Sequence, residues 1–277
     1  MMSYFRSSAN SRCAKVLAVC LVLVFLSSLT AAKRRPKTIT KPSFDPAAES
    51  VDLFDGIDSG ELDVVAIPQD SLHGNVLFKN KTTQPLTVQL PKGFVTQQIL
   101  KQGDREGGGG GGGGAQTGGG GLGGGGGGGG YGGGGGGGLF SIPPARVVKL
   151  PYRSICLEHG KPEPKPRMRY RLVKIDQFTK DPALKELIEM VGMNRINAQA
   201  AQAAAWHVAN KMSWRELASK KRIKFGSRPT LYFSDSELFG AQSLVSVAVG
   251  RAREKARQQK DQEEPIEPAP VRKRTRR

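Results

Sequence analysis

Short runs of branched and aromatic residues, separated by turn-forming residues, follow one another along the first part of the chain. They predict eight β-strands, at residues 62–67, 75–80, 86–90, 94–100, 139–142, 146–150, 153–157 and 170–175. This spacing is typical of antiparallel strands in a meander or a sandwich. Because four strands are too few for a stable sandwich, the runs before and after a glycine-rich tract are predicted to form one β domain over residues 61–176.

Beyond residue 176 the apolar positions recur at helical spacing. Four helices are predicted from their N-terminal signals, which are a cap followed by proline, a cap before an alanine-rich run, and two Ser-x-x-Glu capping boxes. The capping residues are Asp181, Asn197, Ser213 and Ser234. The predicted fold class is therefore α+β, with an antiparallel β-sandwich-like domain followed by a small helical subdomain at residues 177–262.

Glycine changes the picture of the chain's middle. Of the 37 glycines, 27 lie between Gly107 and Gly138, where there is almost nothing to bury. We expect this tract to be a disordered loop inside the β domain, since the entropy of closing a loop grows only slowly with its length. Residues 33–60 are expected to be a flexible leader, and residues 263–277 a disordered basic tail.

The first 32 residues have the pattern of a secretory signal peptide. Arg6, Arg12 and Lys15 precede an apolar run at 16–26, and small residues allow cleavage near Ala32. The run is short for a membrane-spanning helix, although an uncleaved N-terminal anchor is the alternative. We therefore expect an exported protein, in the periplasm, on the cell surface or secreted.

The net charge of +18 points to an acidic partner. Between Lys33 and Glu106 basic and acidic residues balance, so the excess of the chain that remains after signal cleavage lies beyond the glycine tract. For an exported chain, the expected partner is an anionic cell-envelope polymer or lipid surface, or another envelope protein. Nucleic acid is disfavoured because few aromatics interleave the basic residues, and 38% hydrophobic residues is too low for a multi-span membrane protein. The predicted anionic contacts are Arg272, Lys273, Arg274, Arg276 and Arg277.

Cys156 is the one cysteine left after signal cleavage, so an intramolecular disulfide is excluded. A buried thiol is the simplest interpretation. A zinc site or a Cys–His nucleophile pair would need His159 or His207, and the ligand spacing favours neither. No hydrolase or phosphate-binding motif occurs. The sequence therefore predicts no cofactor, no metal and no enzymatic activity, and an extracytoplasmic Cys-dependent hydrolase is kept as an alternative.

Gln202 begins a Gln-x-Ala-x-Trp pattern on the alanine-rich helix, and Cys156 lies upstream in a strand. This pairing resembles the bacterial thioester domain of surface adhesins, although Ala201 stands where the motif of that family has threonine. The resemblance implies a thioester between Cys156 and Gln202, able to acylate an amine on a target surface.

A broader resemblance rests on three segments, which are 79–91, 155–162 and 199–217. They are similar to segments of uncharacterised exported proteins of planctomycete-type bacteria, over roughly residues 62–257 without the glycines. That family implies export and a β-sandwich with C-terminal helices, but no activity. The predicted function is an exported, non-enzymatic binding or structural protein of the cell envelope, with the covalent adhesin as the first alternative.

Overall fold

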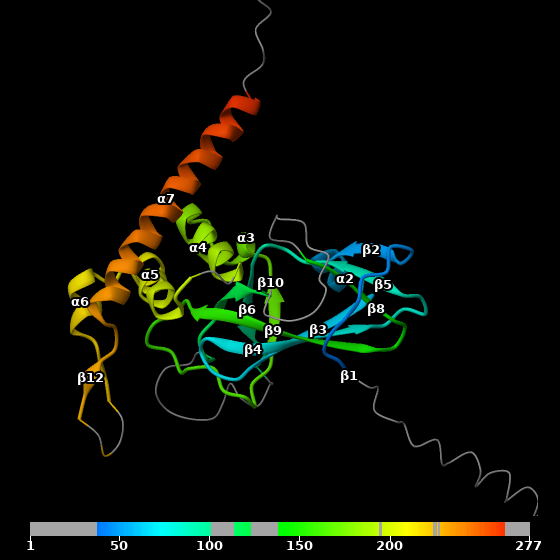
Figure 1. Ribbon diagram of the computed structural model, residues 1–277, viewed down its shortest axis with the longest axis horizontal. Helices are drawn as coiled ribbons and strands as arrows, with labels where there is room; N and C mark the ends of the chain where they lie inside the picture. The colour runs from blue at the N-terminus through cyan, green and yellow to red at the C-terminus, as the bar shows by residue number, and fades with distance from the viewer. Residues whose placement is uncertain are drawn as a thin grey trace, which may run out of the picture. The chain divides into compact units, whose positions relative to one another are not determined.

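Every run predicted as a strand overlaps one in the computed structural model, which describes residues 38–100, 114–122, 138–193, 196–223, 226 and 228–263 (Figure 1). The two runs predicted at 146–150 and 153–157 form one continuous strand through Pro151. The strands are β1 (Thr38–Ile39), β2 (Glu49–Asp52), β3 (Leu62–Pro68), β4 (His73–Asn80), β5 (Leu86–Gln89), β6 (Phe94–Gln98), β7 (Gly118–Gly121), β8 (Leu139–Ile142), β9 (Val147–Cys156), β10 (Tyr170–Val173), β11 (Lys221–Arg222) and β12 (Thr230–Leu231).

Six of these strands close into an antiparallel barrel. In the order β9, β4, β3, β10, β6 and β7, each strand is hydrogen-bonded to the next, and β7 pairs back onto β9. The predicted sandwich is therefore wrong, because a sandwich keeps two separate sheets with open edges. Here β7 joins the edges of β6 and β9, and β1 adds to β9 in parallel.

The closing strand lies inside the glycine tract that we expected to be a disordered loop. Gly118–Gly121 are buried and pair with Phe94–Thr96 on one side and Arg153–Cys156 on the other. A Cβ atom on Gly120 would fall 1.9 Å from the carbonyl oxygen of Arg153. Glycine is therefore required where two backbones approach so closely. The other parts of the tract, at 107–113 and 123–137, lie outside the described residues.

The segment predicted as a flexible leader also contributes to the core. Within it, β2 runs parallel to β5, which pairs with β8 to make a separate three-stranded sheet. The short helix α2 (Leu53–Asp58) follows, with Asp52 as its N-cap. Leu53 and Phe54 are buried together with barrel side chains such as Phe78 and Tyr170. Burial of these two apolar side chains stabilises the segment even though the composition of residues 38–58 is polar. Residues 1–37, with the predicted signal peptide, are not among those described.

After β10 the four predicted helices form with the predicted caps, and one further helix, α3, is a single turn. Asp181 accepts hydrogen bonds from Ala183 and Leu184, and Asn197 from Ala200. Ser213 and Ser234 each form a reciprocal capping box. The helices that follow β10 are α3 (Ile175–Phe178), α4 (Pro182–Gly192), α5 (Ala198–Asn210), α6 (Trp214–Ser219) and α7 (Asp235–Glu263).

The helices pack on the outside of the barrel, next to β7. Val95 of β6 and Ile155 of β9 are buried in a second core with α4, α5 and α7. A Cβ atom on Gly121 would lie 2.7 Å from the Cα atom of Gly192 in α4, so glycine on both elements permits their contact. The described residues of the barrel and the helices belong to one compact unit.

Lys255 of α7 links this helix to α4 through ion pairs. Its ammonium group pairs with Glu186, whose side chain is 6% exposed, and with Glu189. No helix among the described residues is both long and apolar enough to cross a membrane.

Candidate functional site

Cys156 and Gln202, the residues singled out for a thioester, do lie together. The backbone N–H of Cys156 donates to Oε1 of Gln202 at 2.8 Å, and Nε2 of Gln202 donates to the Cys156 carbonyl at 2.8 Å. Both residues are buried. Contact is therefore made between the side-chain amide of Gln202 and the main chain of Cys156.

This contact exists because β9 is longer than its neighbour. The pairing of β4 with β9 begins at His73 and Arg153, and Leu72 still accepts from Ser154. At Cys156 no β4 residue remains opposite, so its N–H and C=O would be buried without partners. The amide of Gln202 presents one acceptor and one donor, as a neighbouring strand would, and satisfies both groups.

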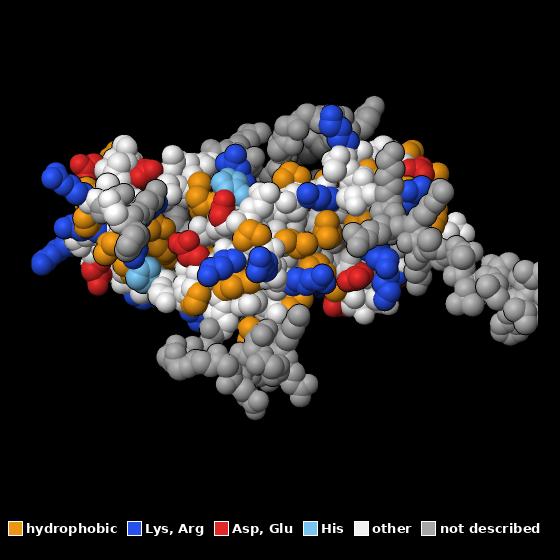
Figure 2. Space-filling model, turned by 90° about the horizontal axis from the view of Figure 1, so that it is seen from below, with side chains coloured by type: hydrophobic (Ala, Val, Ile, Leu, Met, Phe, Trp, Pro, Cys, Tyr) orange, Lys and Arg blue, Asp and Glu red, His pale blue; other side chains and the backbone are white. Residues whose placement is uncertain are grey.

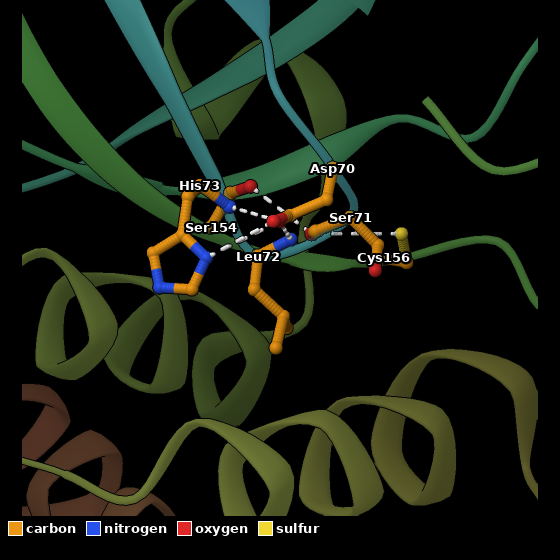
Figure 3. A network of polar contacts seen from close by, with 6 residues as sticks. All are labelled: Asp70, Ser71, Leu72, His73, Ser154 and Cys156. Atoms are coloured by element: carbon orange, nitrogen blue, oxygen red, sulfur yellow. Dashed lines mark hydrogen bonds and ion pairs between the residues drawn. The ribbon is translucent and has the colours of Figure 1, made fainter. Parts of the chain in front are cut away.

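The thiol of Cys156 has a contact of its own, separate from the main-chain contacts with Gln202. Sγ lies 3.9 Å from the carbonyl oxygen of Ser71, the oxygen to which Ser154 also donates (Figure 3). Burial, with smaller contributions from nearby carboxylates, raises the pKa of the thiol to about 12. Since a nucleophilic cysteine needs a thiolate at working pH, this environment disfavours the hydrolase alternative.

Each of the three histidines makes its described contacts with residues other than Cys156. His73 pairs with Asp70 in the turn before β4, and Figure 3 shows its ring pointing away from Cys156. His207 stacks on Trp214 and contacts the Met212 carbonyl. Within the described ranges, no group of three or more His, Cys, Asp and Glu residues is placed to hold a metal ion.

His159 instead belongs to an aromatic and cationic cluster that the sequence did not reveal. Its ring packs edge-on against Trp206, with centroids 4.7 Å apart, and its Nε2 accepts from Nζ of Lys220 at 2.8 Å. Burial and the Lys220 charge lower the pKa of His159. Lys220 also lies over the rings of Trp206 and Tyr232, and Arg222 lies over Tyr232. We call these five residues the cation–aromatic cluster.

The cluster forms the base of the hairpin β11–β12. Register pairs Lys221 with Leu231 and Arg222 with Thr230, so Lys221 and Leu231 share the face opposite to Arg222. Ile223, the next residue on that face, is 80% exposed and Leu231 is 57% exposed. The described ion pairs include none with Lys220, Lys221 or Arg222. The hairpin therefore combines uncompensated positive charge with exposed apolar side chains.

The charged side chains that line one hollow beside β6 are already paired. A hollow of about 370 Å³ beside β6 is lined by Gln98, Thr117, Glu158, Lys161 and Arg171, among others. Glu158 binds Lys161 and Thr117, and Arg171 binds Gln97. These side chains thus hold one another in place.

Compared with known protein families, curated proteins and solved structures, the chain matches none of them. The resemblances to thioester domains and to exported planctomycete-type proteins stay predictions. The predicted tail contacts, from Arg272 to Arg277, lie beyond the described residues.

If the Gln202 amide replaces a strand partner for the main chain of Cys156, its removal should lower stability. Gln202→Leu leaves a buried N–H and a buried C=O without partners, so we expect it to lower the free energy of unfolding by about 2–6 kcal/mol, at roughly 1–3 kcal/mol per group. Gln199→Leu on the same helix is the matched control. The buried Oε1 of Gln199 has no partner among the described residues, so its loss is expected to be nearly neutral in urea unfolding. Equal effects of the two changes would contradict this role.

Proposed function

We propose that the protein is a non-enzymatic binding module that attaches to an anionic, phosphate-bearing surface of the cell envelope. The observation that carries the proposal is the β11–β12 hairpin, where Lys221, Arg222 and Arg228 are present without carboxylate partners among the described residues. Figure 2 shows one face of the molecule with further Lys and Arg side chains spread across it. Such a surface attracts polyanions at long range.

The hairpin has a second property that suits a surface. Ile223 and Leu231 are exposed beside the charges, and apolar side chains flanked by basic ones are typical of segments that lie at a lipid interface. The phosphate groups belong either to a lipid headgroup or to a soluble polymer, and the two probes below distinguish these sources. Export, which this proposal requires, rests on the N-terminal sequence pattern.

Binding is measured with vesicles that contain phosphatidylglycerol and, separately, with polyphosphate, each at low and high salt. The variant Lys221→Gln/Arg222→Gln/Arg228→Gln is expected to weaken vesicle binding about a hundredfold, because each basic residue near an anionic membrane contributes about 1 kcal/mol. The control Lys41→Gln/Lys79→Gln/Lys81→Gln removes the same charge from exposed positions at and near the barrel.

A lipid target predicts that Ile223→Ser also weakens vesicle binding, whereas a polymer target predicts no effect of Ile223→Ser on polyphosphate binding. If the hairpin variant and the barrel control bind equally well, the hairpin is not the contact. If neither probe binds in a salt-sensitive way, the proposal fails.

The covalent adhesin is a second candidate, favoured by the contact between Gln202 and Cys156. Formation of the thioester would join Sγ of Cys156 to Cδ of Gln202 and release the side-chain nitrogen as ammonia. The intact mass of the purified chain is then lower by one ammonia, and Cys156 cannot be alkylated after unfolding. The Gln202→Glu variant is the control. A full mass with one alkylatable thiol at Cys156 would rule this candidate out.

A further inference from the structure

Lys220, in the cation–aromatic cluster, is held by side chains that carry no negative charge. Its Nζ donates to Nε2 of His159 at 2.8 Å, and it lies 5.2 Å from the ring centre of Trp206 and 5.5 Å from that of Tyr232. An ammonium group donates hydrogen bonds and accepts none, so this contact requires a lone pair on Nε2. His159 is therefore neutral here. Lys220 is half-buried beside it, whereas Lys221 is exposed.

Protonation of His159 removes the acceptor that holds Lys220. Nε2 then carries a hydrogen atom, and two positive charges would face each other across the same contact. The cation–π contacts with Trp206 and Tyr232 are weak at a solvent-accessible site, and the flexible stem of a lysine turns readily toward water. The main chain stays in place, because the Lys220 carbonyl accepts from the N–H of Tyr232 at 2.8 Å. The side chain alone is released.

The charged groups around the ring place this change at acidic pH. Burial and the Lys220 ammonium lower the pKa of His159, and Glu216 of α6 opposes them with a smaller effect. A hydrogen bond from the capping hydroxyl of α6 lowers the pKa of Glu216, so its carboxylate stays ionised while His159 titrates. Glu158, the preceding residue, binds Lys161. On the side of α5, the described contacts of His159 are an indole ring and an amide oxygen, both uncharged.

The released side chain would join the cations of the hairpin. Lys220 has extended backbone angles and directly precedes β11, so it lies on the same face as Arg222, two residues further on. Arg222 lies 4.6 Å from the ring centre of Tyr232. His159 is exposed, and solvent protons therefore reach its ring without any opening of the fold.

We propose that His159 and Lys220 form a proton-controlled switch on the β11–β12 hairpin, through which acidification strengthens attachment to the anionic surface. Protonation adds one positive charge at His159 and moves the charge of Lys220 from the aromatic rings toward the partner. This regulation rests on the proposed function, because it changes the charge that the same hairpin presents. By linkage, the bound anionic surface favours the protonated form of His159 to the same extent.

Release of Lys220 is measured first in the protein alone, by NMR of the full chain between about pH 5 and 8, where histidines titrate. At neutral pH the Hε protons of Lys220 are expected to be shifted by the rings of Trp206 and Tyr232. This shift should disappear with the same midpoint as the titration of His159. In His159→Gln the amide oxygen is a permanent acceptor, so the shift should persist at low pH. Lys220 signals that stay constant while His159 titrates would overturn the switch.

Binding to phosphatidylglycerol vesicles is then compared at the two ends of this pH range. Acidification is expected to strengthen wild-type binding about tenfold, as one or two further basic residues near an anionic membrane would. His159→Gln should match the wild type at neutral pH and lose this gain. The control His207→Gln, at a ring that stacks on Trp214, should keep it.

The two measurements separate the switch from the proposed function. An equal gain on acidification in His159→Gln would assign the pH dependence to another group and overturn the proposal. If vesicles are not bound at either pH while the NMR change of Lys220 is intact, the proposed function of the hairpin fails and the switch between His159 and Lys220 stands.

Discussion

The hydrogen bonding of Gly118–Gly121 between β6 and β9 is the constraint on which the rest of the structure depends. Without it, β6 and β9 would each present a row of unpaired N–H and C=O groups. With it, the sheet has no free edge along these two strands, and the apolar side chains of five other strands are enclosed. A strand without side chains contributes nothing to that apolar core, so its contribution is main-chain pairing and close approach.

The close approach of β7 and α4 also holds the helices against the barrel. Gly119 lies under Ile188 of α4, and Gly121 lies against Gly192 at the end of the same helix. Larger residues at these points would push α4 away from the barrel and open the second core, in which Val95 and Ile155 are buried. The alanine face of α5 repeats this principle against α7, where Ala200 faces Gly240. Small residues thus set the spacing of the whole helical layer.

Local signals in the sequence predicted seven of the strands and four of the helices, since caps such as Asp181 and Asn197 and the alternating strand residues act over a few positions. They did not predict β1, β2, α2, α3 or the hairpin β11–β12. The closure of the barrel could not be predicted in the same way. Gly118–Gly121 has no hydrophobic period, and its role depends on partners such as Arg153 that are remote in sequence. The prediction of a flexible leader was wrong because Leu53 and Phe54 are buried, and their burial outweighs the polar composition of the segment.

The candidate site was predicted in part. The resemblance to thioester domains implied that Cys156 and Gln202 lie together, but it could not show that Gln202 substitutes for a missing strand partner. That role follows from where β4 ends. The cation–aromatic cluster was missed because Trp206 and Lys220 are joined only by the packing of α5 against the hairpin. The exposed, positively charged hairpin is what supports a binding function.

The most direct test of the central role of β7 is hydrogen–deuterium exchange of the full chain, followed on fragments that cover residues 114–122. If Gly118–Gly121 closes the barrel, its amides exchange as slowly as those of β6 and β9, and they become exposed together with them on unfolding. Exchange of these glycine amides at the rate of an unstructured peptide, while β6 and β9 stay protected, would contradict the account.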